Sequence, residues 1–253
     1  RSLVGSEMCI RDSINAIYVY QTDGIFQNQE EVDAFYEMYY YTANGGVKPN
    51  NILPAPGETG LNRLRPGARK LVDLNGDGAI TTEDLYYAGD AAPRLAFSIK
   101  AGLEWKGIDF SAFFQGIGKQ VTLRTGSIYA PFVTNYTMQN STFMGKTWTP
   151  ENPDAQYTIL SRDNGFNRFN YENKDISVQN NRYIRLKSLV IGYSLPKQWI
   201  AKAGLSKLRF YFSGDDLWEW TKIKDGYDPE HGEGGNNTFP FSRLITFGVD
   251  LTF

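Results

Sequence analysis

The sequence predicts an all-β fold, and within that class the last part of an antiparallel transmembrane β-barrel with long loops on one side. Three observations lead there. Residues 243–253 (RLITFGVDLTF) alternate apolar and polar side chains over about ten residues, the length that a tilted strand needs to cross a bilayer. No apolar run approaches the ~18 residues of a transmembrane helix. The connections between strand patterns alternate between long and short, as barrel loops and turns do.

Composition narrows the class further. The 253 residues include 26 basic and 28 acidic side chains, so charge gives no case for binding nucleic acid. The 16 Tyr, 16 Phe and 5 Trp suit strands and interfacial girdles better than helices. A single Cys excludes an internal disulfide.

The chain divides into a short tail and one barrel segment. Residues 1–13 (RSLVGSEMCIRDS) lack periodicity and look like translated adapter sequence, so we exclude them from the fold. No signal peptide is visible, and we therefore expect residues 14–253 to be the C-terminal part of a longer barrel.

The elements follow in order. A first strand is expected over residues 14–21 and a helix over about 29–41, where Val32, Phe35, Tyr36 and Tyr39 recur at helical spacing. A loop rich in Pro and Gly then continues to Gly67.

The strongest pattern is a hairpin. Residues 95–105 alternate strictly, Lys106-Gly107 forms a tight turn, and residues 108–115 return. Apolar residues of this hairpin and of the final strand should face outward on a curved sheet; they are Leu95, Phe97, Ile99, Leu103, Ile108, Phe110, Phe247, Val249 and Leu251.

Later strands are expected over residues 182–195, with a bulge near Ser188 where the apolar register switches, and over 207–217. Residues 125–181 and 218–241 form the long connections. The six predicted strands are too few to close a barrel, because the smallest transmembrane barrels have about eight strands. The chain ends on a pattern typical of outer-membrane insertion signals, formed by Thr246, Gly248, Leu251 and Phe253.

One loop has calcium-ligand spacing. Oxygen-bearing side chains or a backbone carbonyl stand at its first, third, fifth, seventh, ninth and twelfth positions, with a Gly at the sixth for the sharp turn. The predicted ligands of a structural Ca²⁺ are Asp73, Asn75, Asp77, Ala79, Thr81 and Asp84. The alternative is a turn rich in Asn, Asp and Gly that binds no metal.

Three aromatic residues, Trp218, Trp220 and Tyr227, are expected in the last long loop near Asp215, Asp216 and Asp225. They are possible contacts for a sugar ligand. The alternative is a girdle at the membrane interface, because the two Trp directly follow a strand end.

Charged and amide side chains on the strands should face the barrel lumen, since a charge facing lipid costs several kcal/mol. They are Asp109, Gln115, Arg185, Lys187, Arg209 and Asp250. His231 is the only His and has no nucleophile nearby, so no catalytic triad is expected. The sequence gives no case for an enzyme or an organic cofactor.

Several segments resemble SusC/RagA-type TonB-linked outer-membrane transporters. They are TDGIFQNQEEVDAF (22–35), DLNGDGAITTED (73–84), LEWKGIDFSAFFQG (103–116) and GYSLPKQWIAKAGLSKLRFYFSGDDLWEWTKIKDGYDPE (192–230). The resemblance implies a barrel of about 22 strands with an N-terminal plug. It further implies location in the Gram-negative outer membrane, energy from TonB, a SusD-like surface lipoprotein as partner, and import of glycan or peptide fragments.

Two other classes compete with this interpretation. A secreted, soluble β-sandwich that binds carbohydrate, with a dockerin-like calcium loop, would suit the short strands and turns. A glycoside hydrolase would need two positioned carboxylates, which the sequence does not identify.

Overall fold

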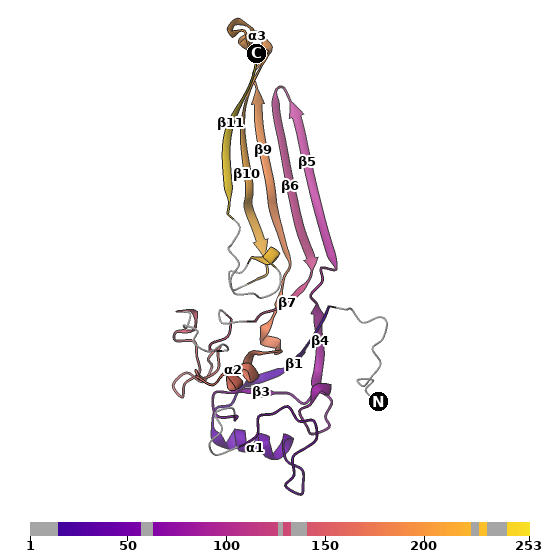
Figure 1. Cartoon of the computed structure of the whole chain (residues 1–253), viewed down its shortest axis with the longest axis vertical. Coiled ribbons are helices and arrows are strands. Elements are labelled where there is room, and N and C mark those ends of the chain that lie inside the picture. Colours follow the sequence, from indigo (N-terminus) through magenta and orange to yellow (C-terminus); the bar gives the residue numbers. More distant parts are fainter. Residues whose placement is uncertain (1–14, 57–62, 126–128, 133–140, 224–227, 232–241) are drawn as a thin grey trace. The chain divides into compact units, whose positions relative to one another are not determined.

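A computed structural model describes residues 15–56, 63–125, 129–132, 141–223, 228–231 and 242–253. Its strands and helices are β1 (Ala16–Tyr20), β2 (Thr22–Ile25), α1 (Gln29–Tyr39), β3 (Arg69–Leu71), β4 (Leu85–Asp90), β5 (Leu95–Trp105), β6 (Ile108–Lys119), β7 (Val121–Leu123), α2 (Asn164–Tyr171), β8 (Val178–Asn180), β9 (Tyr183–Ser194), α3 (Lys197–Ile200), β10 (Lys207–Thr221) and β11 (Leu244–Thr252). Short 3₁₀ turns lie at Thr82–Asp84, Ser141–Phe143, Asp175–Ser177, Ala201–Ala203 and Pro229–His231. Figure 1 shows these elements along the chain.

The chain forms two compact units. The first contains the described residues up to Ala91 and those from Thr122 to Gln179. The second contains residues 92–121 and the described residues from Asn180 onward. The fold class predicted from the sequence is confirmed, since long antiparallel strands dominate and helices are few.

The second unit is a five-stranded antiparallel sheet in the order β11-β10-β9-β6-β5 (Figure 1). Its expected hairpin is confirmed: Trp105 pairs with Ile108, and Lys106 and Gly107 both adopt positive φ, of 49° and 87°. A two-residue hairpin turn with both angles positive matches the twist of the flanking strands.

The two ends of this sheet differ. One end, called the turn end, carries the Lys106-Gly107 turn, the 195–206 connection and Phe253 (Figure 1). The opposite end, called the loop end, is where the long connections leave β6 and β10. The bulge expected near Ser188 is also present, because the register between β6 and β9 shifts between Phe113 and Phe114.

The first unit has a hydrophobic core of its own. Its buried cluster contains Tyr20, Phe26, Val32, Tyr36, Tyr40, Leu53, Leu64, Ala68, Leu71, Ile80 and Phe166. The predicted helix forms as α1, with Asn28 capping its start by accepting from the Glu31 amide at 2.8 Å. Segments expected to be loop therefore fold into a packed unit.

The first predicted strand takes a different place from the one expected. Residues 16–20 form β1, but it pairs with β4 in a separate two-stranded sheet instead of joining the long strands. Five residues span only about 17 Å, too short to cross a bilayer at a tilt. Val19 and Tyr20 are buried, so this strand serves the core of the first unit.

Candidate functional site

One face of the five-stranded sheet is apolar and uncovered. Of the nine residues predicted to face outward, seven are exposed: Leu95, Ile99, Leu103, Ile108, Phe247, Val249 and Leu251. Phe97 and Phe110 are partly exposed, and Phe247 reaches 78%. The soluble β-sandwich alternative requires these side chains to pack in a closed core between two sheets, and in the structure they do not.

Tryptophans mark both ends of this apolar face. Trp105 lies at the turn end of this face and is 60% exposed. Trp218 and Trp220 pair with Leu186 and Ile184 at the loop end and are 49% and 42% exposed. Their expected place in a loop was wrong, because β10 continues to Thr221. They lie on the face opposite Glu219, as a girdle would.

The distance between the two Trp positions fits a membrane. Tyr193, near the turn end of β9, and Ile184, near its loop end, are nine residues apart, or about 30 Å at ~3.3 Å per residue. A tilt of roughly 40° reduces this to a height of about 23 Å, close to the ~25 Å apolar band of outer-membrane barrels.

The opposite face carries the predicted polar residues. Arg209 on β10 donates to Asp109 on β6 (Nη2–Oδ2 2.6 Å) and to Asp250 on β11 (Nη1–Oδ2 2.9 Å). A side chain on β9 would stand between β10 and β6, but the residue there is Gly192. A Cβ at Gly192 would collide with both Asp109 and Arg209.

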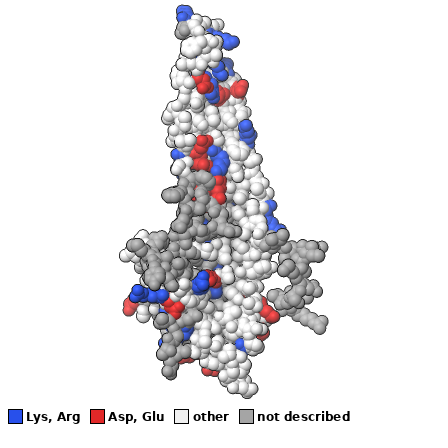
Figure 2. Space-filling view, viewed as in Figure 1, with Lys and Arg blue, Asp and Glu red and all other residues white. Residues whose placement is uncertain are grey.

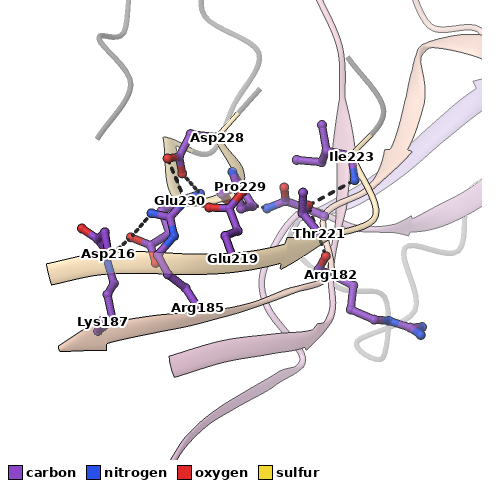
Figure 3. Close-up of polar contacts among 11 residues, drawn as sticks. Arg182, Arg185, Lys187, Asp216, Glu219, Thr221, Ile223, Asp228, Pro229 and Glu230 are labelled. Atoms are coloured by element: carbon purple, nitrogen blue, oxygen red, sulfur yellow. Dashed lines mark hydrogen bonds and ion pairs between the residues drawn. The ribbon is translucent and has the colours of Figure 1, made fainter. Parts of the chain in front are cut away.

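A second ion cluster lies near the loop end (Figure 3). Arg185 on β9, with only 3% of its side chain exposed, pairs with Glu219 on β10 and with Asp228 at 2.8 Å. Its other nitrogen lies 3.3 Å from Glu230.

Lys187, at the bulge of β9, contacts Glu230 at 2.5 Å and Asp216 at 3.2 Å. The segment that contains Asp228 and Glu230 is therefore bound to the polar face of the sheet by two cations.

Sequence reasoning missed the carboxylates of this cluster. Glu219, Asp228 and Glu230 meet Arg185 across 34 to 45 positions of the sequence, and no local pattern indicates that contact. Tyr211, whose ring lies over Gly248, was also missed. A Gly within a strand pattern signals a close approach of this kind.

The predicted calcium loop forms within the first unit and is closed by its own backbone. Asp73 accepts from the Gly76 and Gly78 amides at 2.7 and 2.8 Å. Asp84 is fully buried and accepts from the Leu74 and Thr81 amides, at 2.9 and 2.8 Å.

The rest of the loop is similar. Asn75 and Asp77 accept from the Asp77 and Ala79 amides, at 2.9 and 2.8 Å, and Lys48 donates to the Gly78 carbonyl. Among the described residues, no three His, Cys, Asp or Glu side chains are grouped to hold a metal ion. Calcium binding stays a prediction.

The remaining expectations concern residues that the structure does not describe fully. Tyr227 and the 1–13 tail lie outside the described residues, and the His231 side chain is not described. No helix in the described part of the chain is both long and apolar enough to cross a membrane.

Comparison with known proteins gives a consistent result, although no protein-family profile matches the chain. Two TonB-dependent receptors of Formosa agariphila, P26 and P3, are each 26% identical, over 91% and 96% of this chain. The chain covers 22% and 24% of their lengths.

Solved structures agree on the fold. The RagAB peptide importer in its open-open state matches 100% of the chain with a TM-score of 0.59 and 17% identity. The RagAB peptide transporter matches 94% with a TM-score of 0.60 and 18% identity. The chain spans about a quarter of these proteins, 25% and 23%. These relatives are named as receptors and transporters, which is consistent with the expectation that the chain is not an enzyme. Similarity in sequence to TonB-dependent receptors and similarity in fold to RagAB together support the interpretation of the chain as a segment of a TonB-dependent, SusC/RagA-like transporter.

Proposed function

We propose that the protein containing this chain imports an oligomeric nutrient across the Gram-negative outer membrane. The second unit forms part of its barrel wall. One observation carries the proposal: the uncovered apolar face between two Trp positions is about as tall as the apolar band of an outer-membrane barrel. In water such a face would cost free energy and favour aggregation, whereas lipid covers it.

The opposite face has the chemistry of a water-filled lumen. Arg209 is paired with Asp109 and Asp250 there, and serines and glycines such as Ser111, Ser213 and Gly192 lie between the charged positions. No described side chain of this face stands out as a nucleophile or acid–base pair. Transport without chemistry on the cargo is the function that such a wall supports.

The cargo and partner are proposed from the relatives. RagAB is a peptide importer, and the SusC/RagA type handles glycan or peptide fragments, so we propose an oligopeptide or oligosaccharide as substrate. We propose a SusD-like lipoprotein as partner, on the side where the long connections leave the sheet. TonB would supply the energy through parts of the protein beyond this chain.

Growth experiments test the import function. Deleting the gene should abolish growth on one complex glycan or peptide source, while growth on its monomers persists. Unchanged growth over a broad substrate panel, or hydrolysis of the substrate by the purified protein, would refute the proposal.

A pair of substitutions tests the orientation of the wall. Val249→Lys places a charge on the apolar face and should prevent complementation, because a charge that faces lipid costs up to about 2–4 kcal/mol. Ser213→Lys places the same charge on the polar face and should complement. Equal complementation by both variants would contradict the assignment of the two faces.

We also propose a structural Ca²⁺ in the 73–84 loop, on the strength of its ligand spacing alone. The ion would brace the loop and take no part in transport. Backbone amides already satisfy the carboxylates of this loop, so the contribution of the ion must be measured directly.

A further inference from the structure

The turn end of the sheet carries basic residues in excess. The Lys106-Gly107 turn and the 195–206 connection bring Lys106, Lys197 and Lys202 to this end, and all three side chains are exposed. Within the described residues, none of the three forms an ion pair. The 195–206 connection contains no Asp or Glu.

The carboxylates near this end are mostly engaged elsewhere. Asp109 and Asp250 both pair with Arg209 on the polar face, at 2.6 and 2.9 Å, and therefore do not neutralise the three lysines. Glu104 is the remaining carboxylate of the hairpin tip. Figure 2 shows Lys and Arg atoms at the tip, with the first red carboxylate atoms below it.

Exposed tryptophans accompany these lysines. Trp105 is 60% exposed and Trp199 on α3 is 68% exposed. The Lys106 ammonium lies 4.8 Å from the centre of the Trp105 ring. The buried side chain of Ile200, 4% exposed, anchors α3 to the unit and thereby fixes the position of Trp199.

We propose that the turn end binds anionic phospholipid headgroups through Lys106, Lys197 and Lys202, with Trp105 and Trp199 at the boundary with the acyl chains. This inference rests on the proposed membrane location. It follows from continuity: the same apolar face that lipid would cover ends at Trp105, and a headgroup beyond that ring would meet the three ammonium groups. Indole rings favour this depth of a bilayer, and lysines there attract anionic lipid.

The test uses the full-length protein reconstituted in vesicles of phosphatidylglycerol and phosphatidylcholine in equal amounts. The lipid that stays with the protein after mild detergent extraction is measured by mass spectrometry. A lysine near an anionic surface contributes about 1 kcal/mol, or roughly fivefold in binding. We expect phosphatidylglycerol to be enriched about fivefold or more.

The triple variant Lys106→Gln/Lys197→Gln/Lys202→Gln should lose this enrichment. The matched control is Lys119→Gln/Lys146→Gln/Lys222→Gln, which removes the same charge elsewhere. Lys222 is an apt member because it also lies over a tryptophan, 5.6 Å from the Trp220 ring, but at the loop end. The control should retain the enrichment.

Salt provides a readout without mutation. At about 1 M salt the Debye length falls to ~3 Å, so the enrichment by the unmutated protein should vanish. Equal enrichment by the triple and control variants, or insensitivity to salt, would overturn the inference while leaving transport intact. Failure of the unmutated protein to insert even into neutral vesicles would overturn both.

Discussion

Gly248→Ala should weaken the attachment of the last strand, and the structure shows why. Gly248 on β11 pairs with Tyr211 on β10, and the tyrosine ring lies where a Cβ at Gly248 would be. The added methyl group would be closer than van der Waals contact to three atoms of the Tyr211 side chain, two ring carbons and the hydroxyl oxygen. Tyr211 must then rotate away, or the two strands must separate.

The size of the effect follows from packing. Forcing a methyl group into a filled site costs about 1–3 kcal/mol. The ring is also held near the Arg209 guanidinium, 5.1 Å from its centre, which limits its escape. We therefore expect Gly248→Ala to lower the free energy of unfolding by about 1–3 kcal/mol.

The assay is urea unfolding of the full-length protein in lipid vesicles, with the amount assembled in the outer membrane as a second readout. Gly102→Ala is the matched control, because a Cβ there meets only the Phe110 carbonyl oxygen, at 3.8 Å. Tyr211→Ala should rescue Gly248→Ala, giving a double-mutant coupling of about 1 kcal/mol or more. Equal losses at Gly248 and Gly102, or a failure of rescue, would refute the steric argument.

Three further predictions concern the ion cluster, a buried lysine and the calcium loop. Arg185→Leu should increase hydrogen exchange in residues 228–231, because three carboxylates lose their shared cation; exposed Arg182→Leu is the control, and equal exchange in both would contradict the clamp. Burial lowers the pKa of Lys174 to about 8, so the unfolded chain binds more protons between pH 8 and the ordinary lysine pKa of 10.5. The stability of the first unit should therefore rise by up to about 3 kcal/mol across that window, measured by pulse proteolysis, and Lys174→Met should remove the dependence. Asp77→Ala should abolish calcium-dependent protection of residues 72–87 from proteolysis. Equal protection of the unmutated protein in calcium and in chelator would show that the segment is a turn that binds no calcium.

The periodicity of apolar residues along the sequence predicted the elements whose contacts are with residues nearby in the sequence. Strict alternation on both sides of Lys106-Gly107 specified the β5–β6 hairpin, because each strand is the nearest partner of the other. The apolar periodicity of residues 29–39 predicted α1 in the same way. The bulge near Ser188 was visible as a change of register.

The first unit could not be predicted in this manner. Its core joins single apolar residues such as Leu53, Leu64 and Ile80 from irregular segments, and a single residue has no periodicity. Helix α2 did carry a signal, since Asp163 caps it by accepting from the Phe166 amide, but the surrounding polar sequence hid it. The place of Trp218 was misjudged because Asp216, with φ of 52°, bulges the strand and allows it to continue.

The polar face specifies how the strands of the sheet are arranged. In the proposed membrane location, lipid offers apolar side chains the same environment as neighbouring apolar side chains do, so the apolar face gives little preference for one strand order over another. The backbone hydrogen bonds between strands do not distinguish one strand partner from another. Side-chain specificity must then come from the inner face, where Arg209 connects β10 to β11 and, across Gly192, to β6. Arg185 connects β9 to β10 and to the following segment at the loop end. Each connection requires one register, because a shift by one residue would turn the arginine to the lipid side. Substitution of Gly192, Gly248, Arg185 or Arg209 should therefore alter strand pairing. The apolar positions should tolerate exchange among hydrophobic residues.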